Sequence, residues 1–333
     1  MEQKVLRVSA VVIVGALLLR LLSGGVLGKL TAFALSPQMA SWMIFLQTGR
    51  VVRPTTITFT PDTTEPTQPT EQSPSPEDTP ILPAFSGADA ANITVNAGFT
   101  YTADLPELLS QPLNWELTGD EPTVLILHSH GSESYTPTGE YTENSPYHTL
   151  DTDHNMISVG TYLASLLEDS GIQVLHDTTL HDNPSYSDSY INSRESIQKY
   201  LQKYPSIRLV LDLHRDSIED SNGNQVVQSV FAGDSTLAPL MLVVGTNYGG
   251  RDHPQWRENL SLALKLQTQL EGLCPGICRN LNLRTERFNQ DLSPGTLLIE
   301  VGSSGNTRQE ALRSTQVLAE AIVSLAHGST RGE

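Results

Sequence analysis

The sequence predicts an α/β protein with a three-layer open sheet and helices on both faces, preceded by an N-terminal membrane helix and a disordered stalk. Short apolar runs alternate with amphipathic segments, and this alternation typically places helices against both sides of a sheet. A long uncharged run and a Pro/Thr-rich stretch come before them. We expect three regions: an anchor over 1–33, a stalk over 34–95 and a folded domain over 96–333.

The apolar run near the N-terminus covers residues 8–28 and contains one charge, Arg20. Its length suits a helix that crosses a bilayer, which needs about 20 residues. Arg20 lies toward the far end, where its side chain can reach the interface. A cleaved signal peptide is the alternative, because Ala32-Phe33-Ala34 resembles a small-x-small cleavage site. We expect the uncleaved anchor.

Composition sets further limits. Residues 54–84 are dense in Pro, Thr, Ser and acidic residues, and such a segment buries too little apolar surface to fold. The formal net charge of −17 offers no basic surface to a phosphate backbone, so we expect no nucleic-acid partner. Cys274 and Cys278 leave two alternatives, a local disulfide or two free thiols.

Strands and helices are predicted from periodicity and end signals. Apolar positions over Asn155–Ser170 share one helical face, and Gly171 then supplies a C-cap. A second helix is expected near the C-terminus, with a capping box formed by Asn306 and Gln309. The expected strands are Val124–His128, Ile172–His176, Ile207–Leu213, Leu240–Gly245 and Thr296–Val301, with an edge strand in Val95–Leu105.

Polar residues at the ends of these strands carry the candidate chemistry. His130 and Glu133 follow the first strand in a His-x-x-Glu spacing, and His214 ends a later one. Two histidines and a carboxylate with an open fourth position are typical of catalytic zinc sites. We expect these three residues to bind Zn²⁺.

Further polar residues lie in or at the ends of these strands. Glu300 lies in the apolar strand 296–301, where a carboxylate is costly unless it serves a site, so we expect it to act as the general base. Two alternatives stay open for Asp212, Asp216 and Arg215: either Asp orients an imidazole and Arg215 steadies a carbonyl or substrate carboxylate, or these residues form ordinary ion pairs. For His128 three roles stay open: a ligand in place of His130, a support for a ligand, or a buried strand-end residue.

Several separated motifs, taken in order, resemble the stage II sporulation protein P family of endospore-forming bacteria over roughly residues 120–327. An N-terminal membrane segment and a low-complexity stalk match as well. The matching stretches are His128-Ser129-His130-Gly131-Ser132-Glu133-Ser134-Tyr135, His176-Asp177-Thr178-Thr179, Ser193-Arg194-Glu195, Asp212-Leu213-His214-Arg215-Asp216, Phe288-Asn289-Gln290-Asp291-Leu292 and Leu298-Ile299-Glu300-Val301-Gly302.

The resemblance implies a fold like that of zinc amidases and carboxypeptidases. It implies an N-acetylmuramoyl-L-alanine amidase that cleaves the amide between glycan and stem peptide, with the peptide cross-link as a second target. Implied partners are peptidoglycan, the membrane, a lytic transglycosylase and a membrane scaffold of the engulfment complex. Implied location is the cell membrane at the sporulation septum, as a single-pass protein with an extracytoplasmic catalytic domain. Within the matching stretches, Arg194, Asn289 and Gln290 are expected to contact substrate, and Glu300 and Arg215 to be catalytic.

One departure from the amidase pattern concerns the third ligand. Those amidases use a Glu at the start of the next helix, whereas Thr152-Asp153-His154-Asn155 contains none, which leaves Glu133. Two other functions stay open. A zinc carboxypeptidase would share the ligands but cut a different bond, and a non-catalytic module would only bind the wall or recruit partners.

Overall fold

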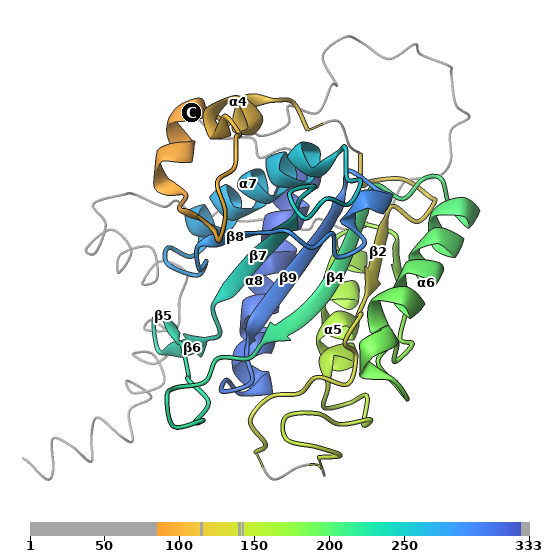
Figure 1. Cartoon of the computed structure of the whole chain (residues 1–333), viewed down its shortest axis with the longest axis vertical. Helices are drawn as coiled ribbons and strands as arrows, with labels where there is room; N and C mark the ends of the chain where they lie inside the picture. Colours follow the sequence, from red (N-terminus) through yellow and green to blue (C-terminus); the bar gives the residue numbers. More distant parts are fainter. Residues whose placement is uncertain (1–84, 114–115, 139–140, 142, 328–333) are drawn as a thin grey trace, which may run out of the picture. The chain divides into compact units, whose positions relative to one another are not determined.

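The structure, a computed structural model, describes residues 85–113, 116–138, 141 and 143–327. Within these residues the chain forms a seven-stranded sheet in the order β1-β8-β7-β9-β4-β2-β3, and a separate hairpin β5-β6 (Figure 1). The strands are β1 (Val95–Ala97), β2 (Val124–Leu127), β3 (Val174–His176), β4 (Leu209–Asp216), β5 (Val230–Ala232), β6 (Ser235–Leu237), β7 (Leu240–Gly245), β8 (Leu281–Arg284) and β9 (Thr296–Ser303).

Strands of the large sheet run in two directions. β3, β2, β4 and β9 are parallel to one another, and so are β7, β8 and β1. The two groups meet at the antiparallel pair β7-β9. Because β2, β4 and β9 are parallel neighbours, their carboxyl ends share one edge, which is where ligand sites of open α/β sheets gather.

Helices cover both faces of the sheet, as the sequence predicts. On one face α5, α7 and α8 pack on β2, β4, β7 and β9 in the main core. On the other face α6 covers β2 and β4 through Ile197, and Phe288 packs on β7 and β9. The helices are η1 (Gly87–Asn92), α4 (Leu105–Ser110), α5 (Met156–Glu168), η2 (Tyr186–Asp188), α6 (Ser189–Lys203), α7 (Trp256–Leu273), η3 (Gln290–Leu292) and α8 (Arg308–His327).

Local sequence explains where these elements begin and end. All four residues of β2 are apolar and buried, because helices cover this strand on both faces of the sheet. α5 begins after Asn155, whose side chain accepts a hydrogen bond from the backbone N–H of Ile157 at 2.9 Å. Gly171 follows the helix with φ +83°, a conformation that glycine adopts at little cost. The predicted helix over 155–170 is confirmed.

The predicted capping box of the C-terminal helix is wrong by one residue. The backbone N–H of Thr307 donates to Oε2 of Glu310 at 2.8 Å, and the N–H of Glu310 donates to Oγ1 of Thr307 at 3.2 Å. Asn306 instead accepts a hydrogen bond from the N–H of Ser303 at 3.0 Å. The box therefore belongs to Thr307 and Glu310, and Asn306 closes the turn before it.

The folded domain extends beyond the predicted boundary at residue 96. Ala90 and Ile93 are buried in the main core, so η1 belongs to the domain. The predicted anchor over 8–28, and all but the last eleven residues of the predicted stalk over 34–95, lie outside the described residues. Across the residues that are described, no helix combines the length and the apolar character needed to cross a membrane.

Candidate metal centre

Two histidines and one glutamate come together at the carboxyl ends of β2 and β4. One donor atom from each of His130, Glu133 and His214 lies within 4.8 Å of the others. Oε1 of Glu133 is 3.3 Å from Nδ1 of His130, and Oε2 is 3.6 Å from Nδ1 of His214. The side chains of Glu133 and His214 are almost entirely buried. We call these three residues the metal trio.

Asp212 holds His214 in place from the other side of the ring. Its Oδ1 lies 2.9 Å from Nε2 of His214, and it accepts hydrogen bonds from the backbone N–H and the hydroxyl of Ser129. Burial would raise the pKa of Asp212, but His214 and these hydrogen bonds hold it below its ordinary value. Asp216, the other candidate, pairs with Arg279 at 2.6 Å. Asp212 is therefore the carboxylate that orients the imidazole.

Arg215 supports Glu133 and the loop around it. Its backbone N–H donates to Oε2 of Glu133 at 3.2 Å, and its guanidinium donates to the main-chain oxygens of Ser134 at 2.9 Å and Tyr147 at 2.7 Å. Burial would raise the pKa of Glu133, but the two histidines and Arg215 hold it well below its ordinary value. We interpret Arg215 as a positioning residue, and its contact with a substrate stays a prediction.

Glu300 lies beside the metal trio because of strand register. It pairs with His214 in the parallel neighbours β4 and β9, so the two side chains project from the same face. Its Oε2 is buried and has no hydrogen-bond partner in the described part of the chain. Burial raises the pKa of Glu300 to about 8. The neighbouring His214 lowers this pKa and the carboxylate of Glu133 raises it, but burial has the largest effect. An unpartnered buried carboxyl of this kind is suited to proton exchange.

His128 lies on the opposite face of the sheet from the metal trio. Its Nδ1 is 3.1 Å from the main-chain oxygen of Leu213, and its Nε2 is 2.9 Å from Nε2 of His176. Burial, with a smaller contribution from His176, lowers the pKa of His128 to about 3. A Cβ on Gly160 of α5 would lie 2.4 Å from Nε2 of His128, so the helix closes this pair. Of the three roles left open for His128, the structure supports the buried strand-end residue.

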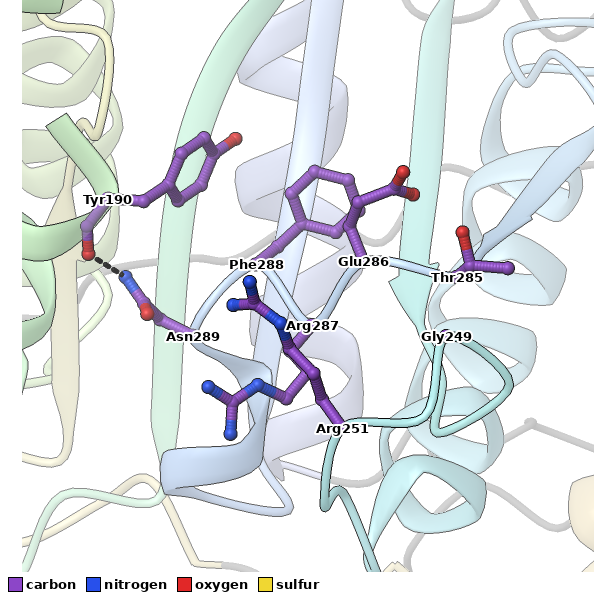
Figure 2. Close-up of a pocket in the computed structure, with 8 residues that line it drawn as sticks. All are labelled: Tyr190, Gly249, Arg251, Thr285, Glu286, Arg287, Phe288 and Asn289. Atoms are coloured by element: carbon purple, nitrogen blue, oxygen red, sulfur yellow. Dashed lines mark hydrogen bonds between the residues drawn. The ribbon is translucent and has the colours of Figure 1, made fainter. Parts of the chain in front are cut away.

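Two of the residues predicted to contact substrate, Arg194 and Asn289, lie near Tyr190. The guanidinium of Arg194 donates two hydrogen bonds of 2.8 Å to Asp291. The amide of Asn289 donates to the main-chain oxygen of Tyr190 at 2.8 Å (Figure 2). These contacts tie the loop after β8 to the first two turns of α6, beside the metal trio.

Gln290, the third of these residues, has a different role. Its side chain is fully buried, accepts a hydrogen bond from the N–H of Gly245 at 2.8 Å, and donates one to the oxygen of Val243 at 2.8 Å. Both ends of its amide are thus used by the main chain of β7. Gln290 therefore positions the loop, and its contact with substrate stays a prediction.

Two tyrosines at the site were missed by sequence reasoning. The ring of Tyr186 stacks on His130 with centroids 4.2 Å apart, and its hydroxyl is 3.2 Å from Nδ1 of His130. Tyr190 lies edge-on to His130 at 5.3 Å and stacks on His214 at 6.2 Å. Their four-residue spacing, just before the Ser193-Arg194 motif, is the signal that would have identified them.

The donor set of the metal trio fits Zn²⁺. Two imidazoles and one carboxylate satisfy three positions of a tetrahedral site and leave the fourth for water or substrate. The ionised Glu133 supplies the negative charge that a buried cation requires. Within the described ranges this is the one group of three such donors with this spacing, and residues 152–155 contribute no member to it. The choice of Glu133 as third candidate ligand agrees with this grouping.

Fold and site define the class of the protein: an α/β protein with a candidate metal centre of two histidines and a glutamate. A sequence model of the family described as Stage II sporulation protein P (SpoIIP) matches residues 54–323, and the chain belongs to this family. The Stage II sporulation protein P of Bacillus subtilis (strain 168) is 26% identical over 216 residues, which cover 62% of this chain and 51% of that protein. The chain thus spans about half the length of this curated relative.

Solved structures similar to this chain include two N-acetylmuramoyl-L-alanine amidases. AmiC2 of Nostoc punctiforme is 15% identical with a TM-score of 0.37, over 63% of this chain and 96% of that one. The amidase of Clostridium difficile 630 is 18% identical with a TM-score of 0.35, over 64% of this chain and 100% of that one. These scores are too low to carry an argument about fold or activity.

Proposed function

We propose that this chain is a zinc-dependent peptidoglycan hydrolase, an N-acetylmuramoyl-L-alanine amidase that cleaves the amide between glycan and stem peptide. Cleavage of the peptide cross-link is a second proposed activity. The observation that carries the proposal is the metal trio with Glu300 in register beside His214. Membership in a sporulation protein family supports the wall polymer as substrate.

Each group of the site has a chemical task in this proposal. A Zn²⁺ held by His130, Glu133 and His214 would polarise the amide carbonyl and make a water molecule more acidic. Glu300 accepts a proton from the attacking water and returns it to the nitrogen of the leaving amine. Asp212 keeps the Nδ1 side of His214 directed toward Glu133. The buried setting strengthens these charge interactions because little water competes with them.

Location and partners form a second part of the proposal. We propose that residues 8–28 anchor the chain in the cell membrane as a single-pass protein, with the folded domain outside the cytoplasm at the sporulation septum. There it would act in engulfment beside a lytic transglycosylase and a membrane scaffold. Family membership and the apolar N-terminal sequence support this placement.

Digestion of purified sacculi by the full-length chain, loaded with zinc, tests the activity. Release of intact stem peptides from the glycan supports the amidase, whereas peptides shortened at the carboxyl end would indicate a carboxypeptidase. Binding to sacculi without any release would indicate a non-catalytic module. The matched control is His214→Ala, which removes one member of the metal trio and is expected to release nothing.

A further inference from the structure

A pocket of about 360 Å³ lies between Tyr190 and the loops after β7 and β8 (Figure 2). Tyr190 forms one wall, and the same ring stacks on His214. The facing walls come from the loops after β7 and β8, with Gly249, Arg251 and residues 285–289. Because Tyr190 contributes to both, the pocket adjoins the metal trio.

Two arginines give the pocket a positive charge. Arg251 is exposed, and no ion pair or hydrogen bond of its side chain is present within the described residues. Arg287 donates to Oδ2 of Asp291 at 3.0 Å, but its Nε is buried without a partner there. Asp291 is also bound by both ends of the Arg194 guanidinium, so one carboxylate serves two arginines. The side chains around the pocket therefore keep a net positive charge, in contrast to the whole chain, whose formal net charge is −17.

The carboxylate that lines the pocket does not cancel this charge. Oε2 of Glu286 lies 3.4 Å from Nε of Arg284, which neutralises it from outside the pocket. Figure 2 shows the carboxylate of Glu286 directed away from the guanidinium groups of Arg251 and Arg287. Arg251 therefore remains available to an anionic ligand, and Arg287 adds positive charge beside it although its Nη1 is bound to Asp291 and to the main-chain oxygen of Asp252.

The loop that carries Arg287 is held in one conformation. A Cβ on Gly249 would lie 2.4 Å from the main-chain oxygen of Thr285, so the two loops approach as closely as only glycine allows. Phe288 and Asn289 adopt φ values of 51° and 58°, in the left-handed region that non-glycine residues enter at a cost. Such strain persists where the surrounding structure fixes the backbone, and a fixed loop binds a ligand with little loss of entropy.

We propose that this pocket binds a carboxylate of the peptide part of the substrate through Arg251 and Arg287, and thereby selects acidic stem peptides. The inference rests on the proposed amidase function. A guanidinium matches a carboxylate with two parallel hydrogen bonds, which gives both affinity and direction. With the scissile amide at the metal trio and Tyr190 along the peptide, the acid groups of the peptide fall on the arginine side.

Two muramoyl tripeptides test the proposal, one with free carboxylates and one with each carboxylate converted to a carboxamide. We expect the zinc-loaded wild-type chain to favour the acidic form in kcat/KM by about 10- to 100-fold, the usual effect of a charged hydrogen bond. Arg251→Gln should remove most of this preference by raising KM for the acidic form, with kcat unchanged. A purely structural role of Arg251 would lower kcat for both tripeptides alike.

Lys199→Gln is the matched control, because it removes the same charge from an exposed residue of α6 outside the pocket. It should keep the wild-type preference, with zinc content and thermal unfolding equal in all three proteins. A preference that persists in Arg251→Gln, or a wild-type chain that hydrolyses both tripeptides equally, overturns the pocket assignment and leaves the amidase proposal intact. A wild-type chain that hydrolyses neither tripeptide nor sacculi overturns both.

Discussion

Two histidine pairs lie on opposite faces of the sheet around β2 and differ in chemical character. On one face, His128 and His176 are in direct contact, with their Nε2 atoms 2.9 Å apart. On the other face, the rings of His130 and His214 lie edge to face with centroids 5.0 Å apart, and Glu133 reaches both. We call His128 and His176 the closed pair, because their rings contact each other directly. We call His130 and His214 the open pair, because the carboxylate of Glu133 lies between their rings.

The difference between the pairs shows what makes two histidines a candidate metal site. Burial lowers the pKa of His128 to about 3 and that of His176 to about 4, so the closed pair stays neutral, but its nitrogens are already used. In the open pair, a carboxylate lies next to each ring and supplies the charge that a cation needs. The anionic donor between separated rings is the deciding feature.

The largest expected effect comes from removing a ring of the open pair. His130→Ala or His214→Ala should abolish both zinc retention and hydrolysis, because two donors do not hold the metal. His128→Ala should retain zinc, because its ring lies on the other face, and should instead lower stability through the cavity it leaves. Metal analysis after dialysis, together with sacculus digestion, measures both. Zinc loss in His128→Ala with zinc kept in His130→Ala would reverse the assignment.

A smaller effect is expected for Glu300→Gln, which keeps the shape of the side chain and removes its ionisation. Zinc content and substrate binding should survive while kcat falls by roughly 10²- to 10⁴-fold. In the wild type, activity should decline as pH falls through the pKa of Glu300, which is about 8 without metal and lower beside a bound cation.

The pH–rate profile of Glu300→Gln should lack this decline. Poor zinc binding by the variant would make Glu300 a ligand, and full activity would leave it a structural carboxylate. Either result would move the role of base to Glu133.

The smallest expected effect is on how the free energy of unfolding depends on pH through the closed pair. The folded-state pKa of His176 is about 4 against 6.5 for a free histidine, so below pH 6.5 the unfolded chain binds more protons than the folded one. Stability from this group is therefore full above pH 6.5 and is lost as pH falls toward 4. His176→Gln should flatten this slope by up to about 1.4 kcal/mol per pH unit.

Chemical denaturation at several pH values measures this slope. His148→Gln, a change at a histidine outside the closed pair, is the control and should keep the wild-type slope. An unchanged slope in His176→Gln would show that His176 does not contribute to the pH dependence of folding.

Much of the fold was predictable because the apolar runs of the sequence coincide with the buried strands of the sheet. The five strands predicted from such runs are all present in the large sheet. The two helices predicted from their end signals are also present, as α5 and α8. β8 was missed because Leu281-Asn282-Leu283-Arg284 reads as a half-polar segment, and only Leu281 and Leu283 are buried. Its membership in the sheet depends on β7 and β1, which are far away in the sequence.

The metal trio was predictable because its members end or follow predicted strands, and parallel strands bring their ends together. The role of His128 was not, because residues two positions apart on a strand point to the same face, whereas here the chain leaves β2 after Leu127 and turns before it reaches His130. The hydrogen bonds of Gln290 were not predictable from the sequence either. Its polarity suggests a binding residue, but its amide satisfies the main chain of β7.

The pairing of His214 with Glu300 also limits how this chain can change in length. Main-chain hydrogen bonds between β4 and β9 set the distance between them, and one inserted or deleted residue inside either strand would turn every following side chain to the opposite face. Such a change would carry Glu300 to the side covered by α8. Insertions and deletions are therefore tolerable in connections such as residues 217–229, where the backbone joins two elements without setting this register. The acid and its neighbouring histidine therefore stay side by side only while the lengths of both strands are unchanged.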